Sequence, residues 1–232
     1  MISRSLRLIV PGIIALMSLL AGCQKSADYT SPVKPSNDDD KPIQDCSIML
    51  PLKAGFSWTF ETNIDQRTFT DVAAVRGPIL VRGRSAILVE TKRNGQLVLR
   101  EAYSCTKGAL LLTAFSTSAK QWVVVDPPLT LLKDGAHLGD EYKWSGQLRI
   151  DGKSIDASGL SRPSVREAVQ TESAGRFSGV RIDSGISAPL PNGDHIKYQT
   201  TRWLATGIGF IRREYLDRTA RRQSNLVSFK MK

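Results

Sequence analysis

The feature that most constrains the fold of this chain is a period-two alternation of apolar and polar residues, which recurs in nearly every segment after residue 46. In the segment 55–62, Phe56, Trp58 and Phe60 lie on one side, and polar residues occupy the positions between them. Such alternation is typical of a strand that is buried on one face only. We therefore expect a domain built from half-buried strands.

Turn residues divide this alternating sequence into many short strands. Asn94-Gly95, Asp151-Gly152 and Asn192-Gly193 predict tight hairpin turns, since these residues tolerate positive φ. Asp126-Pro127-Pro128 is expected to end a strand, because proline cannot donate to a ladder. The segment 164–171 suits a short helix or a strand, and we favour the strand. The predicted strands are 55–62, 69–76, 85–92, 96–105, 109–115, 121–125, 141–150, 153–158, 164–171, 176–183, 195–203, 207–216 and 225–230.

These strands predict an all-β fold with little helix. A long antiparallel sheet must curl, pack as a sandwich or close on itself to cover its apolar face. We expect a curved antiparallel sheet in a half-barrel, barrel-like or sandwich arrangement. The sequence shows no internal repeat and no change of composition after residue 46, so residues 46–232 are predicted to form a single domain.

Residues 1–22 have the plan of a secretory signal. Arg4 and Arg7 form a basic region ahead of the apolar run 8–20, which is short for a transmembrane helix. Leu20-Ala21-Gly22-Cys23 resembles the bacterial lipobox. The resemblance implies that Cys23 receives a diacylglyceryl group and that its freed amine can take a further acyl chain, such as palmitate. Two or more chains anchor a protein stably. The alternative is a plain exported protein with an incidental cysteine.

Residues 23–45 are predicted to be the lipidated cysteine and a disordered tether. Prolines, serines and the acidic run Asp38-Asp39-Asp40 leave this segment little apolar area to bury. Gln24 stands where an inner-membrane retention signal would favour Asp. By resemblance to lipoprotein sorting rules, this indicates the periplasmic face of the outer membrane in a Gram-negative cell.

The predicted domain is strongly basic. Two arginines and three lysines precede Cys46 and are balanced by five aspartates, so the domain keeps the whole formal net charge of +10. An exported, anchored protein meets anionic lipids, glycans and acidic proteins rather than nucleic acid. We expect either a solvated face with local ion pairs or a contact with an anionic surface. The densest basic stretch contains Arg202, Arg212, Arg213, Arg218, Arg221 and Arg222.

Cys46 and Cys105 remain as a pair once Cys23 is lipidated. In an oxidising compartment they form either a disulfide or two free thiols, and we favour the disulfide. The bond would stabilise the domain by about 4 kcal/mol in the chain-entropy model.

The sequence offers no set of residues that looks assembled for catalysis. His137 and His195 lie in separate turn-like contexts without metal-ligand spacing, and we expect both at the surface. The S-x-x-K match from Ser104 to Lys107 closes a strand and lacks its companion motifs. Asp140-Glu141 would face opposite sides of a strand. We therefore predict no enzyme, no metal and no cofactor. A catalytic alternative would need a buried carboxylate cluster that a linear sequence cannot reveal.

Several motifs resemble a known family in the same order along the chain. These are Pro51 to Phe60 (PLKAGFSWTF), Asp126-Pro127-Pro128-Leu129 followed by Gly139 and Trp144, Ser173 to Phe177 (SAGRF), and Trp203 to Glu214 (WLATGIGFIRRE). Together they resemble the TapB-like group of bacterial envelope proteins, over roughly residues 50–216. The motifs consist of Gly, Pro and aromatic positions, so the resemblance implies a fold and supplies no active-site residues.

We consider two functions on this basis. The first is a non-enzymatic binding or scaffold lipoprotein that engages an envelope protein or a glycan, with Arg212 and Arg213 as candidate anionic contacts. The alternative is a carrier for an apolar, lipid-like ligand. In that carrier the candidate cavity lining is Trp58, Phe60, Trp122 and Trp203; the alternative, which we favour, is that these rings fill an ordinary core.

Overall fold

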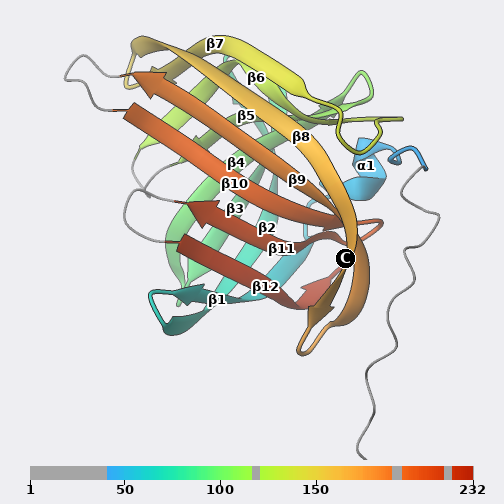
Figure 1. Ribbon diagram of the computed structural model, residues 1–232. Coiled ribbons are helices and arrows are strands. Elements are labelled where there is room, and N and C mark those ends of the chain that lie inside the picture. Colours follow the sequence, from blue (N-terminus) through green and yellow to red (C-terminus); the bar gives the residue numbers. More distant parts are fainter. Residues whose placement is uncertain (1–40, 117–120, 190–194, 217–220, 232) are drawn as a thin grey trace, which may run out of the picture. The chain divides into compact units, whose positions relative to one another are not determined.

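The fold is a closed, antiparallel β-barrel with one short helix (Figure 1). The computed structural model describes residues 41–116, 121–189, 195–216 and 221–231. The helix α1 is Cys46–Met49. The strands are β1 (Ser57–Ile64), β2 (Arg67–Val81), β3 (Arg84–Arg93), β4 (Gln96–Thr106), β5 (Ala109–Ser116), β6 (Trp122–Lys133), β7 (Tyr142–Ile150), β8 (Lys153–Thr171), β9 (Gly175–Pro189), β10 (His195–Ala205), β11 (Gly209–Leu216) and β12 (Arg221–Lys230).

The barrel closes because the last strand pairs with the first. Each strand is hydrogen-bonded to its neighbours in the chain, and β12 joins β1 with Trp58 opposite Phe229 and Asn63 opposite Gln223. Closure gives each strand a neighbour on both sides, and it gives the alternating strands one inner and one outer face. The all-β prediction is confirmed, and among curling, sandwiching and closing it is closure that occurs.

The segment 164–171 is a strand, as favoured from the sequence. It joins the predicted strand 153–158 to form the single long strand β8. A register shift between Pro163 and Val165 lets β8 pass its internal proline while it stays paired with β9. The predicted turn at Asn192-Gly193 lies outside the described residues.

The prediction that Asp126-Pro127-Pro128 ends a strand is wrong, since β6 continues to Lys133. The prolines occupy an irregular stretch of β6, and pairing with β5 resumes at Leu129. Pairing with β7 does end at Asp126. Beyond Asp126, side-chain donors rather than the backbone of β7 bond the carbonyl groups of β6. The Trp144 indole donates to the Pro127 carbonyl over 2.6 Å, and the Ser161 hydroxyl donates to the Leu131 carbonyl over 3.0 Å.

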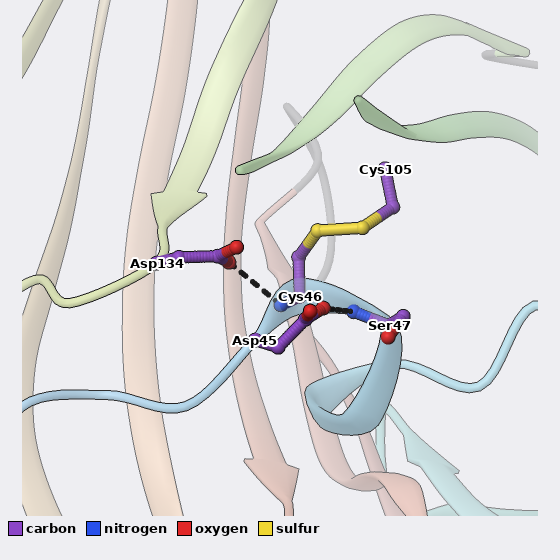
Figure 2. Close-up of a disulfide and its surroundings, with 5 residues drawn as sticks. All are labelled: Asp45, Cys46, Ser47, Cys105 and Asp134. Carbon is purple, nitrogen blue, oxygen red and sulfur yellow. Dashed lines mark hydrogen bonds between the residues drawn. A yellow bond between two sulfur atoms is a disulfide. The ribbon is translucent and has the colours of Figure 1, made fainter. Parts of the chain in front are cut away.

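One end of the barrel carries α1, which a disulfide joins to the wall (Figure 2). Cys46 in α1 and Cys105 in β4 form the bond, with their Cα atoms 6.0 Å apart. The Cys46 backbone N–H also donates to a carboxylate oxygen of Asp134 over 2.8 Å. Asp45 caps the helix by accepting from the Ser47 N–H. The segment leading into the barrel is therefore held by covalent and polar contacts.

Order in the chain begins before Cys46. Ile43, which falls within the predicted tether, is 2% exposed and exchanges backbone hydrogen bonds with the turn after β6. Its N–H donates to Ala136 over 2.8 Å, and its carbonyl accepts from Gly135 over 3.0 Å. The predicted signal and Cys23 lie outside the described residues. In the part of the chain that the structure describes, no helix has the length and apolar character needed to cross a membrane.

Candidate functional site

The residues predicted to bind a ligand do not lie together. Trp58, Phe60 and Arg213 belong to the buried interior, with exposed fractions of 0%, 0% and 1%. Trp122, Trp203 and Arg212 lie on the other side of the wall, as their strand positions and contacts show. The four aromatic candidates therefore do not line one common cavity.

Trp58 and Phe60 fill the core of the barrel. The Trp58 ring packs on Phe56 and Phe210, with centroid separations of 5.1 and 5.3 Å. Its indole N–H donates to the Ile208 carbonyl over 2.6 Å. A buried tryptophan with packed faces and a satisfied N–H is a structural residue. Trp58 and Phe60 therefore fill the core of the barrel, which is the alternative considered for them from the sequence.

The barrel interior also holds a charged cluster centred on Glu101, which we call the interior cluster. It consists of Glu101, Arg202, Arg213, Tyr198 and Tyr215. One Glu101 oxygen accepts from Arg202 over 2.8 Å and from the Tyr198 hydroxyl over 2.7 Å. The other accepts from the Tyr215 hydroxyl over 3.1 Å and lies 3.7 Å from Arg213 Nη1. Two guanidinium groups and two phenols thus surround one carboxylate.

The environment of Glu101 keeps its carboxylate ionised. Burial by itself would raise the pKa of Glu101, because it disfavours the charged form. The positive charges of Arg202 and Arg213, with the hydrogen bonds from Tyr198 and Arg202, outweigh burial and lower this pKa below its usual value. Burial acts in the same direction on the phenols, where it is the dominant effect, and it raises the pKa of Tyr215 to about 12. Glu101 is therefore held as an anion and Tyr215 as a neutral donor.

Some donors near the interior cluster have no acceptor among the described residues. They are Nε of Arg202, Nε and Nη1 of Arg213, and the hydroxyl of Tyr103. Arg213 Nη2 reaches the Thr91 hydroxyl over a long 3.4 Å. Arg202 is better satisfied, because its other nitrogens bond Glu101, Tyr198, Ser184 and Thr200. Arg213 is thus the less satisfied of the two buried arginines.

A second buried ion pair lies nearer the rim opposite α1. Arg93 in β3 donates to both carboxylate oxygens of Asp71 in β2, each over 2.8 Å. Asp71 is 1% exposed. Arg222 in β12 lies near this pair and is partly buried. Its pKa is lowered, first by burial and then by the positive charge of Arg93. Tyr215 and Asp71 act in the opposite direction, and Arg213 adds a smaller lowering effect.

Trp203 lies against the outer face of the barrel, although it is only 4% exposed. The guanidinium groups of Arg181 and Arg212 lie 5.6 and 4.8 Å from its ring centroid. Its indole N–H donates to the Glu167 carboxylate. Side chains of β8, β9 and β11 therefore cover this tryptophan, and their charges surround it on the outer surface.

A groove of about 590 Å³ runs over the same wall, formed by β8 to β12, which faces the viewer in Figure 1. Its lining includes Leu160, Gly185, Gln199, Leu216 and Arg221. We call this the outer groove. Both signs of charge border it, since Arg181 pairs with Asp183 at 3.0 Å and Arg221 pairs with Glu214. The groove therefore combines hydrogen-bonding groups with two partly exposed leucines.

Trp122 belongs to a separate apolar cluster with Val81, Ala86, Ala102 and Ala114. The Arg100 guanidinium lies 5.1 Å from its ring. Beside this cluster, Asp126 pairs with three arginines, Arg82, Arg84 and Arg149, over 3.2 to 3.7 Å. Trp122 thus helps to hold the β2–β3 hairpin against β4, β5 and β6.

Sequence reasoning missed Glu101, although the sequence carries a signal for it. Glu101 falls in register with Leu99 and Tyr103, on the apolar side of the predicted strand 96–105. A carboxylate on a buried face needs a buried cation. Asp71 breaks the alternation of β2 in the same way. Neither position indicates which arginine arrives as its partner.

Metal-ligating and acid–base side chains form few groups among the described residues. Their one grouping with metal-ligand spacing is Asp45, Cys46 and Cys105, where the two sulfurs form the disulfide. His137 and His195 are both exposed, as predicted. The buried carboxylates Asp71 and Glu101 are each held by arginine.

The fold and these sites define a closed β-barrel with a charged interior. No protein-family model matches the chain, and no curated protein sequence matches it. The TapB-like resemblance is therefore not confirmed.

Solved structures place the fold. The chain is similar to a protein of YmcC-like fold from Bacteroides fragilis NCTC 9343, described as a candidate exported protein. The identity is 17%, the match covers 80% of this chain and 100% of that one, and the TM-score is 0.52. This likeness shows that the chain has the YmcC-like fold.

Two further solved structures match at lower TM-scores. A candidate lipoprotein from Parabacteroides distasonis is 14% identical, with 81% of this chain and 100% of that one covered and a TM-score of 0.48. The hypothetical lipoprotein YmcC from Escherichia coli is also 14% identical, with 81% and 90% covered and a TM-score of 0.38.

Proposed function

We propose that this protein is a lipid-anchored, non-enzymatic binding module of the cell envelope, which holds an extended segment of an envelope protein in the outer groove. The anchor rests on the lipobox-like Leu20-Ala21-Gly22-Cys23, which assigns Cys23 as the lipidated residue. The description of the structural neighbour from Bacteroides fragilis as an exported protein is consistent with this location. Residue Gln24 favours the periplasmic face of the outer membrane.

The observation that carries the binding role is the outer groove itself. At about 590 Å³ it is within the size range of ligand sites. Leu160 and Leu216, 37% and 54% exposed, offer apolar contacts, and Gln199 lies among its lining residues. Two ion pairs, each with a positive and a negative side chain, border the groove. The groove therefore suits a peptide segment with both polar and apolar side chains better than a uniformly acidic segment.

The buried carboxylates favour a binding role over an enzymatic one. A general acid or base works best when its pKa lies near the operating pH. The pKa of Glu101 moves the other way, below its usual value. Asp71 is tied by two hydrogen bonds to Arg93. Glu101 is therefore not poised to exchange a proton at neutral pH, and Arg93 occupies both oxygens of Asp71.

The carrier of an apolar ligand has less support. That function needs Trp58, Phe60, Trp122 and Trp203 around one cavity. The first two are packed in the core, and the other two contact arginines of the outer surface.

Site-specific photo-crosslinking in cells tests the proposal. A photoreactive residue at Gln199, in the groove, is compared with one at Ser187, which lies on the same face but outside the groove lining. We expect the Gln199 probe to capture one defined envelope protein and the Ser187 probe not to capture it.

A blocking variant makes this test specific. A Cβ at Gly185 would meet nothing closer than 3.6 Å, so a side chain can start there without a clash, and Gly185→Tyr is designed to place its ring in the groove. Ser187→Tyr is the matched control. Gly185→Tyr should abolish the crosslink and Ser187→Tyr should preserve it. Capture that survives Gly185→Tyr, or capture of glycan alone, would overturn the proposal.

A further inference from the structure

The half of the barrel interior away from α1 holds more positive than negative charge, on two buried and two half-buried arginines. Among the described residues, four arginines and two carboxylates meet there, in two groups. Glu101 faces Arg202 and Arg213, and Asp71 faces Arg93 with Arg222 nearby. Each carboxylate already has a well-placed arginine partner at 2.8 Å. Arg213 and Arg222 are therefore the cations in excess.

Burial makes this excess costly. Arg213 is 1% exposed, and a buried charge without a full counter-charge is strongly destabilising. Its nearest carboxylate oxygen, on Glu101, is 3.7 Å away and already accepts a hydrogen bond from Tyr215. Aromatic rings compensate in part, since the Arg213 guanidinium lies 4.4 Å from the Phe60 centroid and 5.2 Å from that of Phe210. Rings offer no acceptor for its N–H groups.

The unmatched donors point to a ligand of defined chemistry. Nε and Nη1 of Arg213, Nε of Arg202 and the Tyr103 hydroxyl all lack an acceptor among the described residues. All four can donate a hydrogen bond. Guanidinium groups match the planar, paired oxygens of carboxylates and phosphates better than a simple halide. An oxyanion would satisfy both the donors and the excess charge.

Arg222 lies between the rim of the barrel and the interior cluster. It lies at the start of β12, opposite Ile64 at the end of β1, whereas Cys105 at the end of β4 marks the end that α1 occupies. It is paired in register with Tyr215, a member of the interior cluster. Among the described residues, none accepts a hydrogen bond from its guanidinium.

We propose that the interior of the barrel binds one small oxyanion, a phosphate or carboxylate group, which enters past Arg222 and, once bound, contacts both Arg213 and Arg222. The site lies inside the barrel, whereas the outer groove lies on the outside of the wall, although Tyr215 of the interior cluster also lines the groove. The proposal does not depend on the proposed function. The same chemistry could be met by a free anion or by the headgroup of an anionic lipid.

The test measures binding and thermal stability of the whole chain, purified as the cell exports it in a non-ionic detergent. Inorganic phosphate and acetate are titrated against sodium chloride at matched ionic strength, by calorimetry and by thermal unfolding. We expect a saturable rise of the melting temperature with one of the oxyanions and none with chloride. A response that follows ionic strength alone would overturn the proposal.

Three variants locate the site. Arg222→Gln should weaken oxyanion binding by about tenfold, as loss of one charge-assisted contact. Glu101→Gln removes the competing negative charge and should tighten binding. Arg76→Gln is the control, because Arg76 is an exposed arginine paired with Glu90 at 2.9 Å. If Glu101→Gln does not fold, the comparison of wild type with Arg222→Gln still tests the proposal. Equal affinity of these two proteins for the oxyanion would refute the site.

A lipid arm separates the two sources of the anion. Short-chain phosphatidic acid, kept below its micelle concentration, is compared with inorganic phosphate. Similar affinities would assign a free oxyanion, and binding of the lipid alone, weakened by Arg222→Gln, would assign a headgroup. Binding of neither would overturn the proposal.

Discussion

Arg212 and Arg213 are adjacent in the chain, yet their side chains lie on opposite sides of the barrel wall. Arg213 points inward, 1% exposed, and lies 3.7 Å from Glu101. Arg212 points outward, over the ring of Trp203, and pairs with Glu214 at 3.0 Å. Successive residues of a strand alternate between faces. The basic stretch predicted as one surface is therefore divided between interior and exterior.

The two buried arginines should differ in their contribution to stability. Arg202→Met removes the 2.8 Å partner of Glu101 and leaves a buried carboxylate with Arg213 at 3.7 Å. We expect a loss of about 3–5 kcal/mol in the free energy of unfolding. Arg213→Met leaves Glu101 with its closest partner, Arg202. We therefore expect this variant to change the free energy of unfolding little, or to raise it. Denaturant unfolding measures both, and equal losses would contradict this assignment.

Gly146 should be intolerant of any side chain. A Cβ there would lie 2.5 Å from the Asp126 carbonyl oxygen and 2.7 Å from the Trp144 ring. We expect Gly146→Ala to destabilise the protein by about 1–3 kcal/mol, because it separates β6 from β7 and displaces the indole. Gly185→Ala is the matched control, with no contact under 3.6 Å. Thermal unfolding of both variants checks this, and similar melting temperatures would count against it.

The disulfide should stabilise the barrel. Cys46 and Cys105 are 59 residues apart, and closing such a loop in the unfolded chain is worth about 4 kcal/mol in the chain-entropy model. A Cys46→Ser/Cys105→Ser double variant should lose about that amount. Chemical unfolding with and without reductant measures it. Reductant should destabilise the wild type and leave the double variant unchanged; an effect on both would point to another cause.

Alkaline pH should destabilise the protein through its buried tyrosines. The pKa of Tyr215 is raised by burial from 10.0 to about 12, so the folded state keeps a proton that the unfolded state releases. This contribution is present in full below pH 10 and is lost as pH rises through about 12.

Stability measured against pH, together with tyrosinate absorbance, tests this expectation. Tyr215→Phe should flatten the decline between pH 10 and 12. Tyr142→Phe is the comparison, since burial raises the pKa of Tyr142 too, but Tyr142 is only half-buried and its loss should flatten the decline less. A decline of the same steepness in Tyr215→Phe would show that another group is responsible.

Local sequence patterns predicted much of the fold for identifiable reasons. Asn94-Gly95 forms the turn between β3 and β4, with φ of 48° and 78°, because few other residue pairs accept this geometry. Phe56, Trp58 and Phe60 are all buried, as their alternation requires. At Asp126-Pro127-Pro128 the local rule failed, because β5 still offered a partner and Trp144 supplied the missing donor.

The candidate site was less predictable, because it joins residues far apart in the chain. Alternation places Glu101 on an inward face, but Arg213 joins the inward Phe210 only because of the register shift in β10 and β11. Glu101 and Arg213 are also more than a hundred positions apart, and Tyr198 lies on a third strand. The sequence did not indicate that Trp203 would lie outside and Trp58 inside, although both were treated as one aromatic set. Register across the sheet decides such matters, and register depends on bulges such as the shift between Trp203 and Leu204.

By itself the sequence determined the strands, most of their turns and the choice of an all-β domain, because periodicity and turn chemistry are local properties. The tertiary structure decided that the sheet closes, that α1 is tied to the wall through Cys105, and that two of the many arginines are buried around one glutamate. These outcomes depend on which strands become neighbours. A strand records which of its residues share a face, but its partners across the barrel are set by the packing of the whole chain.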